Sequence, residues 1–277
     1  MRESLSLRFL YKTAPGRIVL KALVCPYISV IAGRYLSSGM SKWLVPYYIR
    51  KHKISLNGIQ IPRNGFSSFN EFFTRKNMQE LRLTAHEHLI SPCDGFLTCI
   101  NIKKNLMFSV KHSQFSLEDL LKDRRLASKF YNGTALIFRL TPANYHRYCH
   151  AADGRVLHSR NIPGKLHCVR PIALRERPVF VQNSREYQIV RTDQFGAMVQ
   201  MEVGALLVGK IHNHLQESET SQVRAGSEKG YFEFGGSTII LLFTKDAVCM
   251  RKDLFQNKNS DGEAAVQIGQ VLTQRLT

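Results

Sequence analysis

The second half of the chain is dominated by short runs of β-branched and large apolar residues, separated by Gly, Asn, Asp and Pro. The clearest runs are Thr134–Leu140, Gln188–Arg191, Ala197–Val203 and Ser237–Phe243. Such runs are typical of β-strands, because branched side chains fit a pleated surface and the intervening residues favour turns. The last run contains no charged residue and is typical of a buried strand. We therefore predict a β-rich region after about residue 130.

The first 55 residues have a different pattern. Between Arg8 and Lys53 the chain carries nine Lys or Arg and no Asp or Glu. Apolar residues from Leu20 to Tyr35 recur at spacings of three and four, which favours an amphipathic helix with basic margins. A helix that lies on an anionic membrane surface has this pattern. A helix that packs on its own domain with a solvated basic rim has it too, and periodicity alone leaves both interpretations open.

Two short segments carry helix-capping signals. Ser68 and Glu71 have capping-box spacing before an aromatic run, and Ser116 and Asp119 repeat the arrangement. Together with the strand pattern, these helices predict an α+β protein, with basic N-terminal helices followed by a β-rich core.

The charge balance favours an anionic partner. Lys and Arg number 39 against 21 Asp and Glu, a formal charge of +18, and such a surface attracts the phosphate of a membrane or a nucleic acid. The composition, 44% hydrophobic and 22% charged, excludes a mainly disordered chain. The longest uncharged apolar stretch, Ala22–Gly33, is shorter than the roughly 20 residues that span a bilayer. We expect no transmembrane helix and no signal peptide.

The six cysteines contain no Cys-x-x-Cys pair. This spacing indicates a reducing compartment, such as the cytoplasmic face of a membrane, and argues against a zinc site. The paired histidines His86/His88 and His212/His214 lack a nearby Cys or Asp cluster at ligand spacing. We interpret them as surface or loop residues and predict no metal.

Three separate segments hold residues with catalytic potential: Asp94, the pair His146 and His150, and Ser237. An Asp, a His and a Ser can form a triad in which the imidazole activates the hydroxyl. Gly235 and Gly236 precede Ser237 and permit unusual backbone geometry, so this serine could attack its own preceding peptide bond. The alternative is a glycine-rich entry to a strand. A serine hydrolase is disfavoured, because a Gly-x-Ser-x-Gly elbow is absent at Ser237.

Several longer stretches resemble the phosphatidylserine decarboxylase family, and they occur in the family's order. They are Phe69–Arg75, Ser91–Gly95, Phe138–Tyr148, Ile162–Leu166, Met201–Ala205 and Lys229–Phe243. The resemblance extends from about residue 66 to 245 and is far more specific than any single motif. It implies a catalytic domain at 61–277, preceded by a membrane-associating helical region at 1–60.

The resemblance further implies a self-processing enzyme. Ser237 would attack the carbonyl of Gly236 to form an ester, and elimination would then split the chain. The products would be a β chain of residues 1–236 and an α chain of residues 237–277 that begins with a pyruvoyl group. The family pattern places Asp94 with His146 or His150 near the serine hydroxyl.

The implied reaction converts phosphatidylserine into phosphatidylethanolamine and CO2. The substrate amine would form a Schiff base with the pyruvoyl carbonyl, which acts as an electron sink when CO2 leaves. A histidine suits the final proton transfer, because its ordinary pKa lies near neutral pH. Apart from this covalent pyruvate, no cofactor, metal or nucleotide is expected.

The sequence departs from the family at one position. Many members have His-Arg-x-His, whereas Cys149 stands here at the second histidine and His150 follows it. If this segment is a strand, the His150 side chain leaves on the opposite face from the expected one. We therefore assign decarboxylation chemistry to His146 and leave the division of roles with His150 open.

These features predict a peripheral membrane enzyme whose partners are phosphatidylserine and an anionic membrane surface. The processed α and β chains would stay together, no nucleic acid is expected, and a homo-oligomer is left open. The competing interpretation is a basic membrane-surface or nucleic-acid-binding module without catalysis, which charge alone supports.

Overall fold

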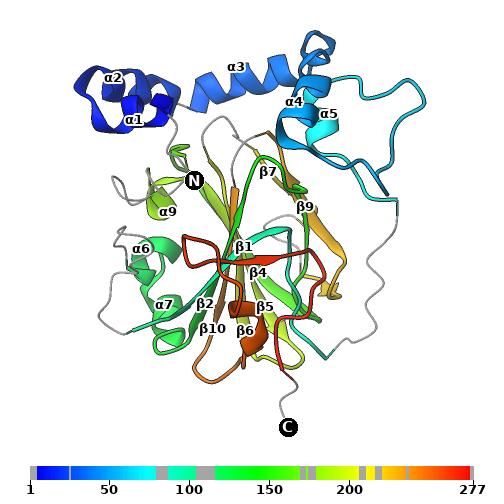
Figure 1. Cartoon of the computed structure of the whole chain (residues 1–277). Helices are drawn as coiled ribbons and strands as arrows, with labels where there is room; N and C mark the ends of the chain where they lie inside the picture. The colour runs from blue at the N-terminus through cyan, green and yellow to red at the C-terminus, as the bar shows by residue number, and fades with distance from the viewer. Residues whose placement is uncertain are drawn as a thin grey trace.

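The computed structural model describes residues 5–24, 26–78, 87–103, 116–168, 173, 179–205, 210–215, 220–234 and 237–274. An eight-stranded antiparallel sheet forms its centre (Figure 1). In spatial order the strands are β11 (Ala264–Val266), β1 (Gly95–Asn101), β2 (Thr134–Leu140), β10 (Ser237–Phe243), β6 (Ala197–Val203), β5 (Arg185–Thr192), β4 (Gly154–Ile162) and β8 (Gln222–Val223). With the helices described below, this sheet confirms the predicted α+β class.

Strand β10 lies between β2 and β6 and is buried along its whole length. Its side chains alternate between two apolar clusters: Ile240 and Leu242 pack on one face, and Ile239 and Leu241 on the other. This burial on both faces explains why the run is continuously apolar rather than alternating.

A smaller sheet covers one face of the large sheet. It consists of β3 (Arg147–Cys149), β9 (Glu228–Phe232) and β7 (Ile211–Asn213), in the order β3-β9-β7. Tyr148 pairs with Gly230 but Cys149 pairs with Glu228, so Lys229 is the extra residue of a β-bulge. A bulge redirects the side chain it contains, and here Lys229 points at Glu202 of the large sheet.

Short helices cover the opposite face: α6 (Leu117–Leu121), α7 (Arg124–Lys129) and α9 (Val179–Gln182). Leu120 and Phe180 belong to the apolar cluster on this face. The Ser116 hydroxyl accepts a hydrogen bond from the Asp119 amide, as the capping signal predicted. A 3-10 helix, η2 (Lys252–Phe255), lies near the C-terminus.

The N-terminal helices lie at one end of the large sheet (Figure 1). They are α1 (Leu5–Lys12), α2 (Ala14–Leu23), α3 (Pro26–Ser37), the 3-10 helix η1 (Gly39–Ser41), α4 (Leu44–His52) and α5 (Phe69–Phe73). The Ser68 hydroxyl caps α5 by accepting from the Glu71 amide. Within the described ranges, no helix has the length and apolar character needed to cross a bilayer.

The predicted apolar stripe from Leu20 to Tyr35 is not one continuous face. Helix α2 ends at Leu23 and α3 begins at Pro26, because proline lacks the amide proton that would continue a helix. Leu20 and Val24 are buried in the core, whereas Tyr27 and Ile31 are exposed. The stripe therefore divides into a half that anchors the helices and a half that faces solvent.

Candidate active site

Ser237 is the first residue of β10 and lies opposite Leu140, the last residue of β2. Its side chain is fully buried, and its hydroxyl has no hydrogen-bond partner among the described residues. A buried hydroxyl without a partner is costly, and such groups occur where chemistry needs them. Gly236, the other half of the predicted cleavage site, lies outside the described residues, as does Gly235.

Asp94 immediately precedes β1. In the register of the sheet Phe96 lies opposite Arg139, so β1 begins beside the end of β2, where Ser237 also lies. The half-buried Asp94 carboxylate accepts a hydrogen bond of 2.9 Å from the Ile268 amide. The antiparallel topology thus brings Asp94 and Ser237 to the same end of the sheet.

His146 follows the turn after β2 and is fully buried. Its imidazole packs on the Phe73 ring at a centroid distance of 3.9 Å, and Phe73 contacts the edge of Phe234 at 5.1 Å. Because Phe234 lies three residues before Ser237, this aromatic contact places His146 beside the start of β10. Neither imidazole nitrogen has a hydrogen-bond partner.

Arg75 is a buried residue of this region to which the sequence analysis gave no role. Its Nη2 atom donates to the Asn144 carbonyl at 3.4 Å, while Nε and Nη1 have no partner. Burial lowers the pKa of Arg75, and the neighbouring Tyr145 and Asp94 oppose that shift. Its position at the end of the Phe69–Arg75 stretch was the only sequence signal for it. We call Arg75, Asp94, His146 and Ser237 the Ser237 corner.

Burial, and secondarily the charge of Arg75, lowers the pKa of His146 to about 3. The imidazole is therefore neutral at neutral pH and able to accept a proton, but a pKa this low makes it a weak base. It differs from the near-neutral pKa that the sequence suggested. His146 and Ser237 each lack a hydrogen bond, so they are not bonded to one another. Three of the four predicted site residues, Asp94, His146 and Ser237, thus lie at the same corner of the sheet. Ser237 and His146 are not hydrogen-bonded to one another or to Asp94.

His150 lies at the other end of β3, away from this corner. Its amide donates to the Ser227 carbonyl at 2.9 Å. Burial, followed by the nearby Lys229 and His214, lowers the pKa of His150 to about 3. Cys149 packs with Ile90 and Ala225 in a separate small cluster.

A second buried polar group lies between the two sheets and was not predicted from the sequence. The Lys229 Nζ atom is 2.5 Å from Glu202 Oε2, and both side chains are completely buried. Lys229 also donates to Asn213 Oδ1 at 2.7 Å, and Gln200 Nε2 donates to the Cys149 carbonyl at 2.9 Å. We call Lys229, Glu202, Asn213 and Gln200 the Lys229 network.

Burial and the neighbouring charge act in opposite directions on the pKa values of Lys229 and Glu202. Burial lowers the pKa of Lys229, and Glu202 opposes that shift. Burial raises the pKa of Glu202, and Lys229 opposes it. The mutual attraction of the two groups thus favours the ionised pair.

The pair His212/His214 has acidic partners, whereas His88 is partly buried and its Nδ1 has no partner among the described residues. His212 Nε2 lies 2.7 Å from Glu233, and His214 Nε2 lies 2.8 Å from Glu228. His86 lies outside the described residues. Where the chain is described, no three His, Cys, Asp or Glu side chains gather in a way that could hold a metal ion.

Comparison with known proteins identifies the family of the chain. The profile of the phosphatidylserine decarboxylase family matches residues 69–274, which include every member of the Ser237 corner and the Lys229 network. The chain belongs to the phosphatidylserine decarboxylase family.

Individual relatives match over nearly the whole chain. Phosphatidylserine decarboxylase proenzyme 2 of Clostridium acetobutylicum is 38% identical, with 95% of this chain and 90% of that protein covered. The phosphatidylserine decarboxylase proenzyme of Ruminiclostridium cellulolyticum is also 38% identical, over 96% and 90% of the two chains. The corresponding proenzyme of Chlamydia muridarum is 36% identical, over 99% and 92%.

Proposed function

We propose that this chain is an enzyme that decarboxylates phosphatidylserine to phosphatidylethanolamine and CO2, after cutting itself between Gly236 and Ser237. Family membership supports the reaction. The observation that carries the self-processing is the Ser237 hydroxyl, which is buried without a partner at the start of the central strand and directly follows two glycines.

Self-processing begins with the Ser237 hydroxyl. Its oxygen attacks the carbonyl carbon of Gly236, and the peptide C–N bond is exchanged for an ester bond. Removal of the Ser237 Cα proton then expels the Gly236 carboxylate and leaves a dehydroalanine, which tautomerises to an imine. Water adds to this imine and displaces ammonia, so that residue 237 becomes a pyruvoyl group. Two glycines before the serine leave the attacked carbonyl free of side-chain obstruction.

His146 is the proton acceptor for the Ser237 hydroxyl in this proposal. Its depressed pKa keeps the imidazole neutral, and although the Asn144 backbone lies close enough to act on it, neither nitrogen makes a hydrogen bond of ordinary geometry to the described residues. Arg75, whose charge acts on both His146 and Asp94, balances the Asp94 carboxylate in a region where apolar rings exclude water. Small movements must bring the imidazole to the hydroxyl, since the two are not hydrogen-bonded in the uncut chain.

The surroundings of Ser237 fit a pyruvoyl group, because the buried oxygen has no competing partner and Phe73 and Phe234 shield this end of the sheet. Such a group supplies a carbonyl that condenses with the substrate amine and accepts electron density as CO2 leaves. The residues of the Ser237 corner orient the substrate there and hold or return its protons.

An intact-mass spectrum of the purified chain tests the proposal. We expect two fragments, residues 1–236 and 237–277, with the second lighter by one ammonia than an ordinary serine-initiated peptide. A decarboxylation assay with phosphatidylserine vesicles then reads the activity. An uncut, inactive chain would support the alternative of a basic binding module without catalysis.

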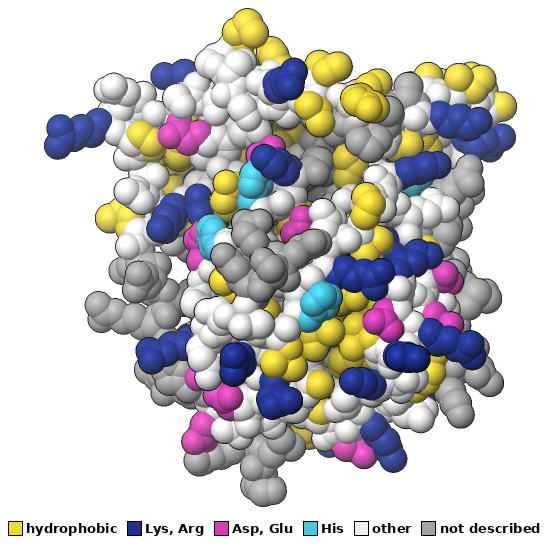
Figure 2. Space-filling model, turned by 180° about the vertical axis from the view of Figure 1, so that it is seen from behind, with side chains coloured by type: hydrophobic (Ala, Val, Ile, Leu, Met, Phe, Trp, Pro, Cys, Tyr) yellow, Lys and Arg dark blue, Asp and Glu magenta, His cyan; other side chains and the backbone are white. Residues whose placement is uncertain are grey.

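We further propose that the N-terminal helices rest on an anionic membrane surface, where the lipid substrate resides. The exposed apolar side chains of these helices include Leu5, Ile18, Tyr27, Ile31, Met40 and Trp43. Hydrophobic and basic side chains lie close together at this end of the molecule (Figure 2). Each basic residue near such a surface contributes on the order of 1 kcal/mol, screened within roughly 8–10 Å.

Sedimentation with vesicles tests this attachment. Binding of the full chain should increase with phosphatidylserine content and weaken without vanishing as salt rises, because apolar contacts are not screened. Replacing Ile31 and Trp43 by Ser should weaken binding at high salt most. Equal sedimentation of this variant and the natural chain would show that the exposed apolar residues do not reach the membrane.

A further inference from the structure

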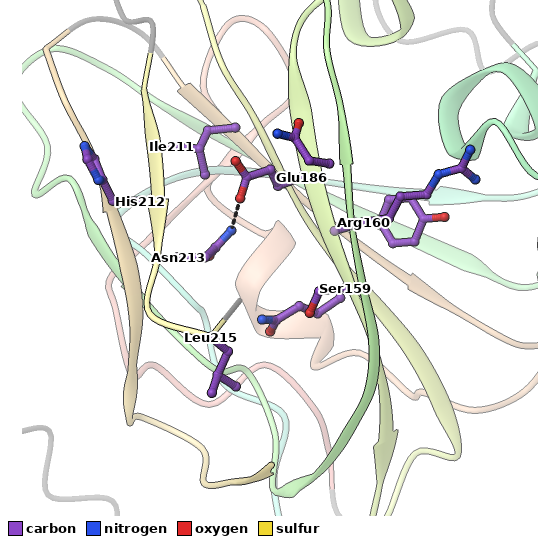
Figure 3. Close-up of a pocket in the computed structure, with 10 residues that line it drawn as sticks. Ser159, Arg160, Glu186, Ile211, His212, Asn213 and Leu215 are labelled. Carbon is purple, nitrogen blue, oxygen red and sulfur yellow. Dashed lines mark hydrogen bonds between the residues drawn. The ribbon is translucent and has the colours of Figure 1, made fainter. Parts of the chain in front are cut away.

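A pocket of about 690 Å³ lies between the face of the large sheet at β4 and β5 and strand β7 (Figure 3). Its polar lining includes Ser159, Asn161, Glu186, Gln188 and Asn213. Pockets of this size commonly hold small molecules or parts of larger ligands. Nothing in the proposed reaction uses it.

The sheet register gathers the polar residues of the pocket on one face. Ser159 lies opposite Gln188, and Asn161 opposite Glu186. On the next strand Glu186 lies opposite Glu202, which carries the polar row toward β10. With strands spaced about 4.8 Å apart, Glu186 on β5 is about 10 Å from Ile239 on β10, and Ser237 lies two residues further along that strand. No residue of the Ser237 corner lines the pocket.

Two buried polar side chains in the pocket have no partner. Gln188 is 1% exposed, and neither its amide nitrogen nor its amide oxygen forms a hydrogen bond. The Ser159 hydroxyl, opposite it on β4, is also buried and unpaired. Leaving such groups unsatisfied costs free energy that a polar ligand would recover. The amide of Gln188 and the hydroxyl of Ser159 can therefore form hydrogen bonds with the hydroxyl or ester oxygens of a ligand.

The charge of the pocket indicates the sign of that ligand. The Glu186 carboxylate accepts a hydrogen bond of 2.8 Å from Asn213 but has no cationic partner among the described residues. Arg160 does not neutralise it, because its guanidinium donates to the Leu121 and Lys122 carbonyls on the other face of the sheet. In Figure 3 the Arg160 side chain points away from Glu186.

Lys229 and His212, two further groups near the pocket that can carry a positive charge, are held by other residues. Lys229 is held by Glu202 and Asn213. His212 stacks on Tyr231 and contacts Glu233. The two neighbouring carboxylates, Glu186 and Glu202, thus share one ammonium group, that of Lys229, which leaves one excess negative charge among these three groups. A carboxylate with excess negative charge, beside an amide and a hydroxyl, suits a small primary ammonium compound with an oxygen nearby.

We propose that this pocket binds the primary ammonium group of an amino alcohol or of its phosphate ester. Glu186 is the counter-ion, and Gln188 and Ser159 contact the neighbouring oxygen. For a lipid head group, the inference rests on the proposed function, whose product carries such an amine. Free ethanolamine presents the same chemistry from solution.

Binding is measured on the full-length Ser237→Ala chain, which cannot form a carbonyl at residue 237 and so cannot trap an amine covalently. Isothermal titration uses ethanolamine as the probe. Glu186→Gln should weaken binding at least tenfold, because it removes the counter-ion. Glu118→Gln removes the same charge from α6, on the opposite face of the sheet, and should leave binding unchanged.

A second variant, Gln188→Met, guards against misfolding as an explanation. It replaces an unpaired buried amide by an apolar side chain of similar length, so the protein should melt at the same or a higher temperature while ethanolamine binding falls at least tenfold. The idea is overturned if ethanolamine does not bind, or if it binds Glu186→Gln and Gln188→Met as tightly as the parent.

Vesicles identify the source of the amine. If Glu186→Gln reduces attachment to phosphatidylethanolamine vesicles but not to phosphatidylcholine vesicles, the pocket receives a lipid head group. If it affects free ethanolamine alone, the ligand comes from solution. Decarboxylation and cutting of the natural chain are measured separately, so failure of the proposed function and failure of this pocket give different results.

Discussion

The Ser237 corner and the Lys229 network are both buried polar regions, yet their polar atoms are treated in opposite ways. In the network, Lys229, Glu202 and Asn213 form a connected set of hydrogen bonds. In the corner, the Ser237 hydroxyl and both His146 nitrogens have no partner. Buried charges that are paired hold a structure in one arrangement. Buried polar groups without a hydrogen bond, such as a hydroxyl or a neutral imidazole, remain available for reaction.

This contrast separates two histidines that the sequence places four residues apart. His146 lies in the corner against Phe73, and His150 lies at the end of β3 next to Lys229. Burial removes the charge from both, but only His146 is near Ser237. The comparison predicts that substitutions in the corner affect chemistry and those in the network affect stability.

The largest expected effect is a complete loss of self-cleavage and of decarboxylase activity. Ser237→Ala removes both the nucleophile and the atoms that would become the pyruvoyl group, so the chain should stay uncut and inactive, as intact mass and a decarboxylation assay would show. Thr238→Val is a matched control, because the Thr238 hydroxyl is also buried and unpaired. Normal activity in Ser237→Ala would refute the assignment of the site.

The next effect compares the two histidines. His146→Ala should slow processing and turnover by about 10²–10⁴-fold, the range typical of a lost general base. His150→Ala should change either rate by much less, because His150 is not in the corner. Rates follow from quenched samples of newly synthesised chain and from CO2 release. If His150→Ala slowed the reactions more than His146→Ala does, His150 would be the general base.

Asp94 supplies a further variant for the same comparison. Asp94→Asn removes the carboxylate whose charge acts on Arg75 but preserves the hydrogen bond that the side-chain oxygen accepts from Ile268. We expect processing to slow while the melting temperature changes little. If the melting temperature falls markedly together with the processing rate, Asp94 has a structural role.

Breaking the Lys229 network should destabilise the protein. Lys229→Met leaves Glu202 buried without its counter-ion, which costs about 3–5 kcal/mol of unfolding free energy. The double variant Lys229→Met with Glu202→Leu should recover much of that loss, because neither charge remains. The single and the double variant are each made in the uncut Ser237→Ala chain, and urea unfolding gives the free energy of unfolding of both. A destabilisation below about 1 kcal/mol for the single variant would show that the pair is unimportant.

Per residue, the smallest effect on stability is that of pH. His146 and His150 have pKa values of about 3 when folded, against 6.5 ordinarily, so the unfolded chain binds more protons between these values. Stability is therefore fully present above pH 6.5 and falls as the pH is lowered toward 3. At pH 5 the loss is about 2 kcal/mol per histidine. His150→Phe should reduce the slope, and an unchanged slope would contradict the burial of His150 as its cause.

Much of the fold could be predicted because apolar patterning is a local signal. The predicted runs Thr134–Leu140, Ala197–Val203 and Ser237–Phe243 coincide with β2, β6 and β10. Strand β4 was missed, because one of its faces lines a polar pocket and its sequence does not alternate in the usual way.

The site was predictable only in part, for a physical reason. Motifs named Asp94, His146 and Ser237, but the position of His150 depends on the pairing of β3 with β9 and on the bulge at Lys229. Arg75 and Glu202 gain significance only from burial, which no local pattern reports. Neighbouring sequence identifies reactive residues, whereas tertiary register decides which of them meet.

The position of β10 at the centre of the sheet has a kinetic consequence. Once the bond before Ser237 is cut, β10 stays hydrogen-bonded to β2 and β6, and β11 to β1, so the short fragment is interleaved with the long one. Unfolding would release two polypeptides, and refolding would become a second-order encounter that slows on dilution. The uncut chain refolds in a first-order process. Under the proposed cleavage, maturation would make the fold a one-time product of the precursor, which dilute separated fragments would regain only slowly.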